Sequence, residues 1–167
     1  MAKHPATTGL LAGIAVIALA ACGGTAEDPA GGDQVAEADA PPVIKERQDN
    51  FEEMGDSFKA IMDNMKTGTP DLAMIADKAK IINTNAGKIT GHFPEGTSIA
   101  DGFDTEALPA IWEKPEEFAA AADRAVSVSA DFVAAAESGD AAATGESAKA
   151  MGGACKNCHD QFREEDD

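Results

Sequence analysis

Two cysteines and a histidine lie close together near the C-terminus, in the stretch CKNCH at residues 155–159. Three kinds of chemistry use such a set: a zinc site, a dithiol redox cycle and covalent attachment of haem. A closed zinc site needs four ligands, so zinc would require the distant His92 or a carboxylate. A dithiol oxidoreductase normally carries its CxxC motif beside a βαβ unit, and this sequence predicts no such unit. Haem attachment is therefore the interpretation we favour.

The spacing of these three residues on a helix suits the attachment of haem. Residues three and four positions apart lie on one face of a helix, so Cys155 and Cys158 can present both sulfurs to the two vinyl groups of one porphyrin. His159 can then turn its imidazole toward the iron. Because CxxCH is the attachment signature of c-type haem, we expect one haem c per chain, held by these three residues.

The apolar residues from Pro42 onward recur at alternating steps of three and four, which is the pattern of helices that bury one stripe. Four segments carry it: 44–65, 71–91, 115 to the SGD at 138–140, and 148–162. No segment alternates as a strand does, so the sequence predicts an all-α fold, an antiparallel four-helix bundle. The long connection from 91 to 115 holds the only tryptophan, Trp112. We expect this connection to close one end of the bundle; the alternative is direct contact with a ligand.

Residues 1–21 are typical of a secretory signal, because a basic start precedes an apolar run and small residues. The apolar run is too short to cross a membrane, which takes about 20 residues. Residues 19–22 match the bacterial lipobox, in which the cysteine is acylated; the alternative is an ordinary cleavage site followed by a stray cysteine. We expect Cys22 to be lipidated, and Gly23 after it resembles lipoproteins sorted to the outer membrane of a Gram-negative cell.

Residues 22–42 are mostly glycine, alanine, proline and acid, which predicts a disordered linker before a folded domain at 43–167. The formal charge of the chain is -17. Nucleic acid and anionic lipid are poor partners for such a surface. We expect a periplasmic protein that touches the membrane only through lipidated Cys22 and meets a redox partner through a basic patch on that partner.

Three stretches together resemble the class II c-type cytochromes, typified by cytochrome c′: IKERQDNFEEMG, ALPAIWEKPEEF and CKNCHDQFR. The resemblance covers about residues 42–164. It implies a haem embedded in a left-handed four-helix bundle, His159 as the proximal ligand, and a homodimer. Members of the family carry electrons or bind small gases such as nitric oxide and carbon monoxide.

Two arginines are candidates for the surroundings of the haem. Arg47 falls on the apolar stripe of the first helix, where a cation needs an anion unless its side chain reaches out to water. The resemblance implies that Arg47 and Gln48 lie beside a haem propionate. Arg163, one turn after His159, is implied to lie beside the proximal histidine; the alternative is pairing with Asp160 or with the acidic tail.

The sixth coordination site of the iron depends on Phe51 and Met54. Phe51 is at the position that resembles the family's distal residue, and a phenyl ring cannot ligate a metal. We therefore expect five-coordinate iron and a gas-binding, electron-transferring protein rather than an enzyme. Met54 lies on the same face, and its thioether could ligate the iron in a six-coordinate electron carrier, but ordinary core packing is the interpretation of Met54 that we favour. A third hypothesis, a scavenging enzyme, has no distal histidine except His92.

Overall fold

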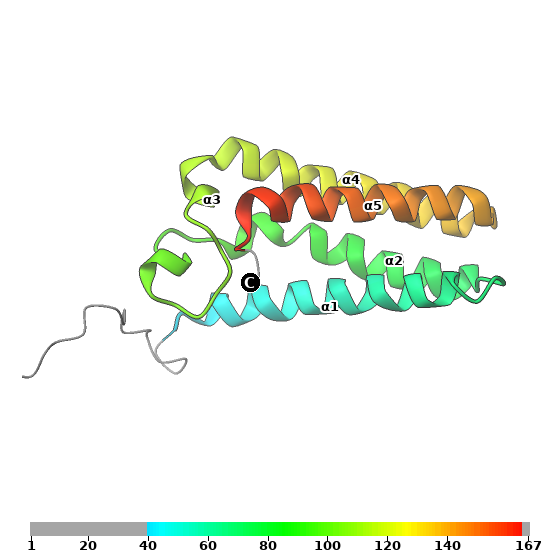
Figure 1. Ribbon diagram of the computed structural model, residues 1–167, viewed down its shortest axis with the longest axis horizontal. Helices are drawn as coiled ribbons and strands as arrows, with labels where there is room; N and C mark the ends of the chain where they lie inside the picture. The colour runs from blue at the N-terminus through cyan, green and yellow to red at the C-terminus, as the bar shows by residue number, and fades with distance from the viewer. Residues whose placement is uncertain (1–39, 165–167) are drawn as a thin grey trace, which may run out of the picture. The chain divides into compact units, whose positions relative to one another are not determined.

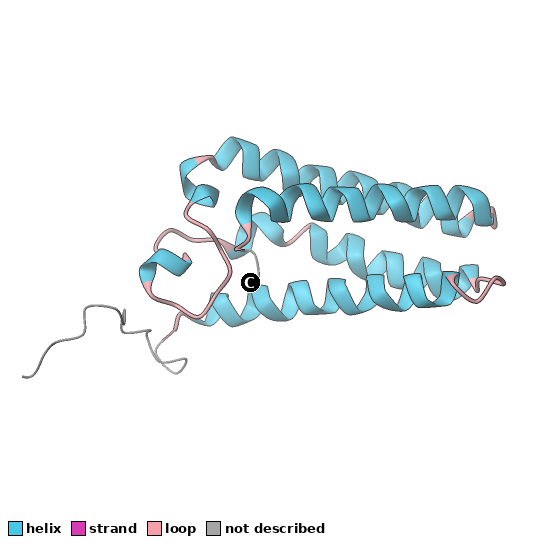
Figure 2. Cartoon of the chain, in the orientation of Figure 1, coloured by secondary structure: helices cyan, strands magenta, loops and turns pink. Residues whose placement is uncertain are grey.

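The computed structural model describes residues 40–164. The predicted signal, the predicted lipidation site Cys22 and nearly all of the predicted linker lie outside these residues. Four long helices form the described part: α1 (Pro42–Met65), α2 (Leu72–Ala86), α4 (Pro115–Glu137) and α5 (Ala141–Phe162) (Figure 1). Between α2 and α4 lie two 3₁₀ turns, η2 (Ile89–His92) and η3 (Ile99–Asp101), and the single-turn helix α3 (Ala110–Glu113). Figure 2 shows helix and loop over residues 40–164, and the predicted all-α fold is confirmed.

Local sequence signals set most of the helix ends. Asp71 caps α2 by accepting the backbone N–H of Met74 at 3.0 Å, and Asp140 caps α5 by accepting those of Ala142 and Ala143. An aspartate at this position satisfies amide groups that have no partner inside the helix. Proline opens α4 at its first position, where no backbone N–H is needed. The predicted breaks between the helices therefore lie where the sequence indicates.

The second helix ends earlier than its predicted limit at Gly91. α2 ends at Ala86, and a 3₁₀ turn follows after two further residues. The carbonyl of Asn85 accepts the backbone N–H of Lys88 at 3.0 Å and the side-chain amide of Asn50, on α1, at 3.2 Å. A carbonyl bonded to the residue three positions on belongs to the tighter 3₁₀ pattern. A contact from another helix thus accompanies the change of helix type.

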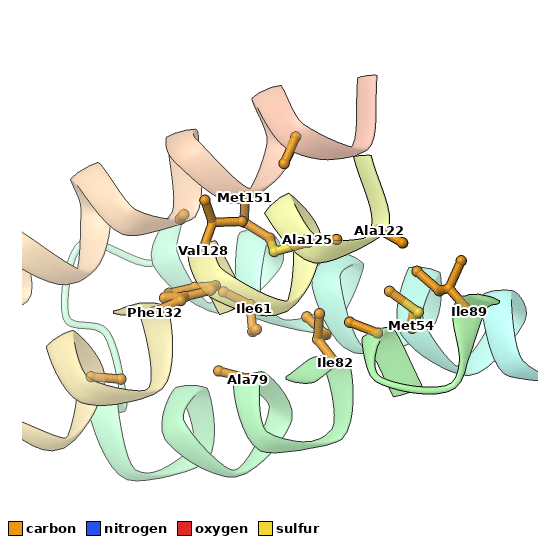
Figure 3. Close-up of a cluster of buried hydrophobic side chains, with 14 of the residues drawn as sticks. Met54, Ile61, Ala79, Ile82, Ile89, Ala122, Ala125, Val128, Phe132 and Met151 are labelled. Carbon is orange, nitrogen blue, oxygen red and sulfur yellow. The ribbon is translucent and has the colours of Figure 1, made fainter. Parts of the chain in front are cut away.

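The helices pack as two antiparallel pairs. α1 lies against α2, α4 lies against α5, and α2 joins the pairs by packing on α4. In Figure 1 both short turns lie at one end of the bundle and the long connection lies at the other. Figure 3 shows side chains from all four helices meeting in the core. Its largest fully buried apolar members are Ile61, Ile75, Ile82, Phe132 and Met151.

Side chains of α1 reach the α5 backbone toward the end with the short turns. A Cβ atom placed on Gly152 of α5 would lie 3.5 Å from the ring of Phe58 on α1, and one on Gly145 would lie 3.5 Å from the terminal methyl of Met65. Glycine at these two positions leaves room for the ends of the α1 side chains. We call this part, where Gly145 and Gly152 face α1, the closed end of the bundle.

Aromatic rings fill the end of the bundle beneath the long connection. Phe93 packs edge-on against Phe118 with ring centroids 4.9 Å apart, and Phe118 packs on Phe162 at 5.3 Å. The Trp112 indole N–H donates to the carbonyl of Phe93 at 3.1 Å, and its ring lies 6.2 Å from the Phe93 ring. The tryptophan thus packs on the outer side of this cluster, as a residue that closes the bundle end would.

Candidate functional site

A cavity of about 640 Å³ lies between α1 and α5, on the side of Phe58 away from the closed end. Pockets that hold organic cofactors have volumes of about 300–1,000 Å³ and mostly apolar walls. One wall consists of α1 residues from Arg47 to Phe58, and the facing wall consists of α5 residues from Met151 to Arg163. The long connection contributes Phe93, Ile111 and residues 104–107. The rest of the lining comes from Ile82 on α2, Ile89 on η2, and Phe118, Ala121 and Ala125 on α4. The helices that touch at the closed end are therefore separated here.

The two thiols lie on the α5 wall of this cavity. Cys155 and Cys158 are half-buried and both line it, one helical turn apart. Burial raises the pKa of the Cys155 thiol, and burial together with the neighbouring Cys155 raises the pKa of Cys158 to about 11. Reactive cysteines of dithiol redox sites instead have lowered pKa values, because the thiolate is the nucleophile. The raised pKa values of these two thiols do not suit a dithiol redox cycle.

His159 follows on the same wall, with its imidazole exposed along the cavity. Its pKa is lowered, first by partial desolvation and then by the positive charge of Arg163, while Glu106 and Asp160 act in the opposite direction. A lowered pKa keeps the imidazole neutral at neutral pH. A neutral imidazole has a lone pair to donate to a metal.

Arg47 is the most deeply buried cation of the cavity, with 2% of its surface exposed. Its guanidinium donates to the hydroxyl and carbonyl of Thr97 at 2.9 and 2.6 Å and to the hydroxyl of Thr105 at 2.7 Å. The guanidinium carbon also lies 5.0 Å from the centre of the Phe93 ring. Desolvation lowers the pKa of Arg47 to about 10. Within residues 40–164 its hydrogen-bond partners are all uncharged, so an anion in the cavity would meet a desolvated positive charge.

Gln48 lines the same part of the cavity, at its mouth. Its side-chain amide donates to the carbonyl of Asp104 at 3.0 Å, which ties the exposed side of α1 to the long connection. The two residues implied to lie beside a propionate are therefore adjacent to the cavity, although both are already held by the long connection. No sequence pattern marks Thr97 and Thr105 as partners of Arg47, because these threonines lie in a segment without periodicity.

Phe51 and Met54 both line the α1 wall, opposite the thiols. Phe51 is half-buried and packs edge-on against Phe93, with ring centroids 6.3 Å apart. Met54 is buried in the hydrophobic core, and its sulfur accepts a long hydrogen bond of 3.8 Å from the side-chain amide of Asn50. The Phe51 ring and the Met54 thioether therefore lie on the same wall of the cavity.

Arg163 has a partner that the sequence did not reveal. Its guanidinium forms a fork on the carboxylate of Glu106, with Nε 2.6 Å and Nη2 3.0 Å from the two oxygens. Asp160, one of the partners considered from the sequence, instead bonds Lys156 at 2.6 Å. Glu106 is 57 residues away in the chain, and nothing in the local pattern indicates such a pair. Arg163 nevertheless lies near enough to His159 for its charge to act on the imidazole.

The comparisons with known proteins agree with this arrangement. Residues 42–163 match the family model described as cytochrome c′. The chain belongs to the cytochrome c′ family. It is 35% identical over 122 residues to cytochrome c′ of Pararhodospirillum photometricum, which covers 72% of this chain and 95% of that protein.

Two solved structures extend the likeness to three dimensions. Cytochrome c′ of Rubrivivax gelatinosus superposes with a TM-score of 0.66 at 32% identity, over 73% of this chain and 94% of that one. A nitric oxide complex of a variant cytochrome c prime from Alcaligenes xylosoxidans gives a TM-score of 0.66 at 25% identity, over 74% and 94% of the two chains.

Cytochrome c′ proteins carry one covalent c-type haem per chain, and this member of the family therefore does so as well. The cavity fits such a group on three observations. Its volume suits an organic cofactor, its α5 wall carries two thiols that are not poised as thiolates, and its mouth holds a buried guanidinium with uncharged partners. The propionates of a porphyrin would supply an anion for this guanidinium.

Proposed function

We propose that this protein is an exported haem protein that transfers electrons and binds small gases such as nitric oxide and carbon monoxide at five-coordinate iron. The observation that carries the proposal is the cavity between α1 and α5, with Cys155, Cys158 and His159 on one wall and Phe51 on the other. The bound haem supplies an iron that changes oxidation state and takes a diatomic ligand. The protein supplies two thioether links, a neutral imidazole and an apolar wall.

The open sixth position rests on the chemistry of the α1 wall. Phe51 offers only carbon to the cavity, and its ring restricts the space that a diatomic molecule could occupy. Met54 is the one thioether on the same wall among residues 47–58, and it supports the alternative function, a six-coordinate electron carrier. Against this alternative, Met54 packs in the core and its sulfur already accepts the Asn50 amide. We therefore assign Met54 to packing.

Optical and electron paramagnetic resonance spectra of the resting ferric protein test this assignment. We expect a high-spin wild-type protein that is unchanged by Met54→Leu and becomes low-spin on Phe51→Met, because the new thioether stands where the ring was. Met54→Leu keeps the volume of the side chain and removes only the sulfur. A low-spin wild-type protein that turns high-spin on Met54→Leu would establish the six-coordinate carrier instead.

An enzymatic role is less well supported than binding and electron transfer. A peroxidase-like site needs a base on the distal wall, and His92 lies on η2, outside the residues that line the cavity. The Arg47 guanidinium at the cavity mouth is held by two threonines and is suited to anchoring an anion. We therefore propose a carrier and gas-binding protein with an unidentified redox partner, which we expect to present a basic patch. The family resemblance also favours a homodimer, which analytical ultracentrifugation measures directly.

The location of the protein rests on residues outside the described part. Among residues 40–164 no helix is both long and apolar enough to cross a membrane. We propose that residues 1–21 direct export to the periplasm and that acyl chains on Cys22 hold the protein at the outer membrane. Cys22→Ser is expected to release a haem-loaded protein into the periplasmic fraction. Recovery of that variant with the membranes would contradict the lipid anchor.

A further inference from the structure

One short segment of the long connection is bonded to both helices that wall the cavity. On the α1 side, the carbonyl of Asp104 accepts Gln48 and the hydroxyl of Thr105 accepts Arg47. On the α5 side, the backbone pairs with the end of the helix as an isolated antiparallel bridge between Ala107 and Arg163. We call residues 104–108 the strap. Residues 104–107 line the cavity, so the strap borders it and joins α1 to α5.

Backbone hydrogen bonds fix the strap at the point where α5 ends. Leu108 donates its N–H to the carbonyl of Phe162 at 3.1 Å, and Glu164 donates to the carbonyl of Glu106 at 2.8 Å. The N–H of Arg163 still donates to the carbonyl of His159 at 3.0 Å, inside the last helical turn. Arg163 is therefore hydrogen-bonded to the backbone of His159 and lies opposite Ala107 of the strap.

The side chains of Glu106 and Arg163 continue this attachment with a charged fork. Two parallel N–H···O bonds fix the plane of a guanidinium, which a single ion contact does not. The side chains are 52% and 38% exposed, so the pair is open to water and to salt. Its Coulomb energy is accordingly small, and its main physical effect is on orientation. Both charges also lie close enough to His159 to act on the imidazole with opposite signs.

We propose that Glu106 is a positioning residue, which holds the Arg163 guanidinium at a fixed place beside His159 and thereby sets the electrostatic surroundings of the haem on its histidine side. This inference rests on the proposed function, because it takes His159 as the proximal ligand. The carboxylate does two things at once. It offsets the positive charge of Arg163, and it keeps that charge from moving toward the imidazole.

Substitution of Glu106 removes its negative charge and keeps the positive charge of Arg163. Glu106→Gln keeps the length and an oxygen acceptor but removes the negative charge and the charged fork that Glu106 provides. Loss of a negative charge near the haem stabilises the reduced, less positive iron. We therefore expect the midpoint reduction potential to move to a more positive value in Glu106→Gln, and the shift to shrink at high ionic strength because the pair is exposed.

A matched control lies in the same strap. Asp104→Asn removes the same unit of charge two residues away, where the contact to Gln48 is made by the backbone carbonyl and survives the change. We expect a smaller shift of potential in this variant. Thermal unfolding and the haem mass retained after denaturation should match the wild type in both variants, which excludes a general loss of structure.

A double-mutant cycle with Arg163→Gln distinguishes positioning from simple charge. If Glu106 acts through the guanidinium, its substitution shifts the potential differently in the Arg163→Gln background than in the wild type, so the two shifts are not additive. The ferrous iron–histidine stretching band in resonance Raman spectra should move with the same pattern. Additive shifts, or equal shifts for Glu106→Gln and Asp104→Asn, would overturn the inference and leave the proposed function standing. A wild-type protein that loses its haem on denaturation would overturn the proposed function itself.

Discussion

The two ends of the pair formed by α1 and α5 differ in what stands between the helices. At the closed end, Gly145 and Gly152 present no side chain, and the ends of Met65 and Phe58 reach nearly to the α5 backbone. At the other end, side chains of both helices face a cavity of about 640 Å³. The same two helices thus form a packed core over one half and a cofactor site over the other. The difference goes with residue type along α5, where glycines meet the side chains of α1 at the closed end and cysteines and a histidine line the cavity.

The polar chemistry of the two ends differs as well. The mouth of the cavity holds a buried guanidinium with uncharged partners, a combination that protein cores normally avoid. Near the closed end, charges lie outside and pair with one another, as Lys59 and Lys66 do with Asp63. Lys59 and Lys66 near the closed end are exposed, whereas Arg47 is buried and lines the cavity.

Loss of Cys155 or Cys158 should have the largest effect on the difference between the two ends, because these thiols are expected to hold the haem in the cavity. In Cys155→Ala or Cys158→Ala one thioether bond at most can form, so we expect poor maturation, lower stability and a large loss of covalently held haem. Mass spectrometry of the denatured protein measures the haem retained, with Cys22→Ser as a control that leaves both thiols intact. Clean extraction of haem from the wild type into acidic organic solvent would contradict covalent attachment.

Filling the closed end should have an intermediate effect. A leucine at Gly152 must displace the Phe58 ring, which lines the floor of the cavity, and such overpacking costs about 1–3 kcal/mol. Gly152→Ala meets the ring at an ordinary contact distance of 3.5 Å and should instead stabilise the helix by up to about 1 kcal/mol. Chemical denaturation followed by circular dichroism measures both.

Gly153 provides the matched control for this series, because a Cβ atom there would meet nothing within 4 Å. Gly153→Leu should be neutral or slightly stabilising. Equal destabilisation by leucine at both positions would mean that the close approach of α1 and α5 does not limit residue size at Gly152.

The smallest expected effect concerns the exposed charges near the closed end. Hydrogen bonds and charge from Lys59 and Lys66 lower the pKa of Asp63 from 3.8 to about 2. A carboxylate with a lowered pKa stabilises the folded state above its unfolded pKa, and this contribution disappears as the pH falls toward 2. The Asp63→Asn variant should therefore have a slightly lower melting temperature than the wild type at neutral pH. The difference in melting temperature should shrink in acid and in high salt.

Thermal melts of the wild type and Asp63→Asn from neutral pH to pH 2 measure this contribution. Asp123→Asn, which removes an exposed carboxylate of α4 that forms no ion pair within residues 40–164, provides the control. A gap that stays constant with pH, or that Asp123→Asn reproduces, would show that pairing with the lysines is not its source.

The sequence by itself determined the features that depend on near neighbours in the chain. Helix formation follows from apolar spacing, and the caps at Asp71 and Asp140 act on amides two or three residues away. The shared face of Cys155, Cys158 and His159 follows from helix geometry alone. The fold and the haem were predictable because they depend on such short-range spacing. The predicted limit of the second helix at Gly91 was wrong, since α2 ends at Ala86 where Asn50 of another helix bonds the carbonyl of Asn85.

Only the tertiary structure decided which distant groups meet. The threonines that hold Arg47 are 50 and 58 residues away, and the carboxylate that holds Arg163 is 57 residues away. These partners lie in a connection without helical or strand periodicity, so no local pattern marks them. The width of the cavity likewise depends on how α1 and α5 approach each other across the bundle. Such contacts follow from the packing of the whole domain, because their energy comes from pairs that the chain brings together only when it has folded.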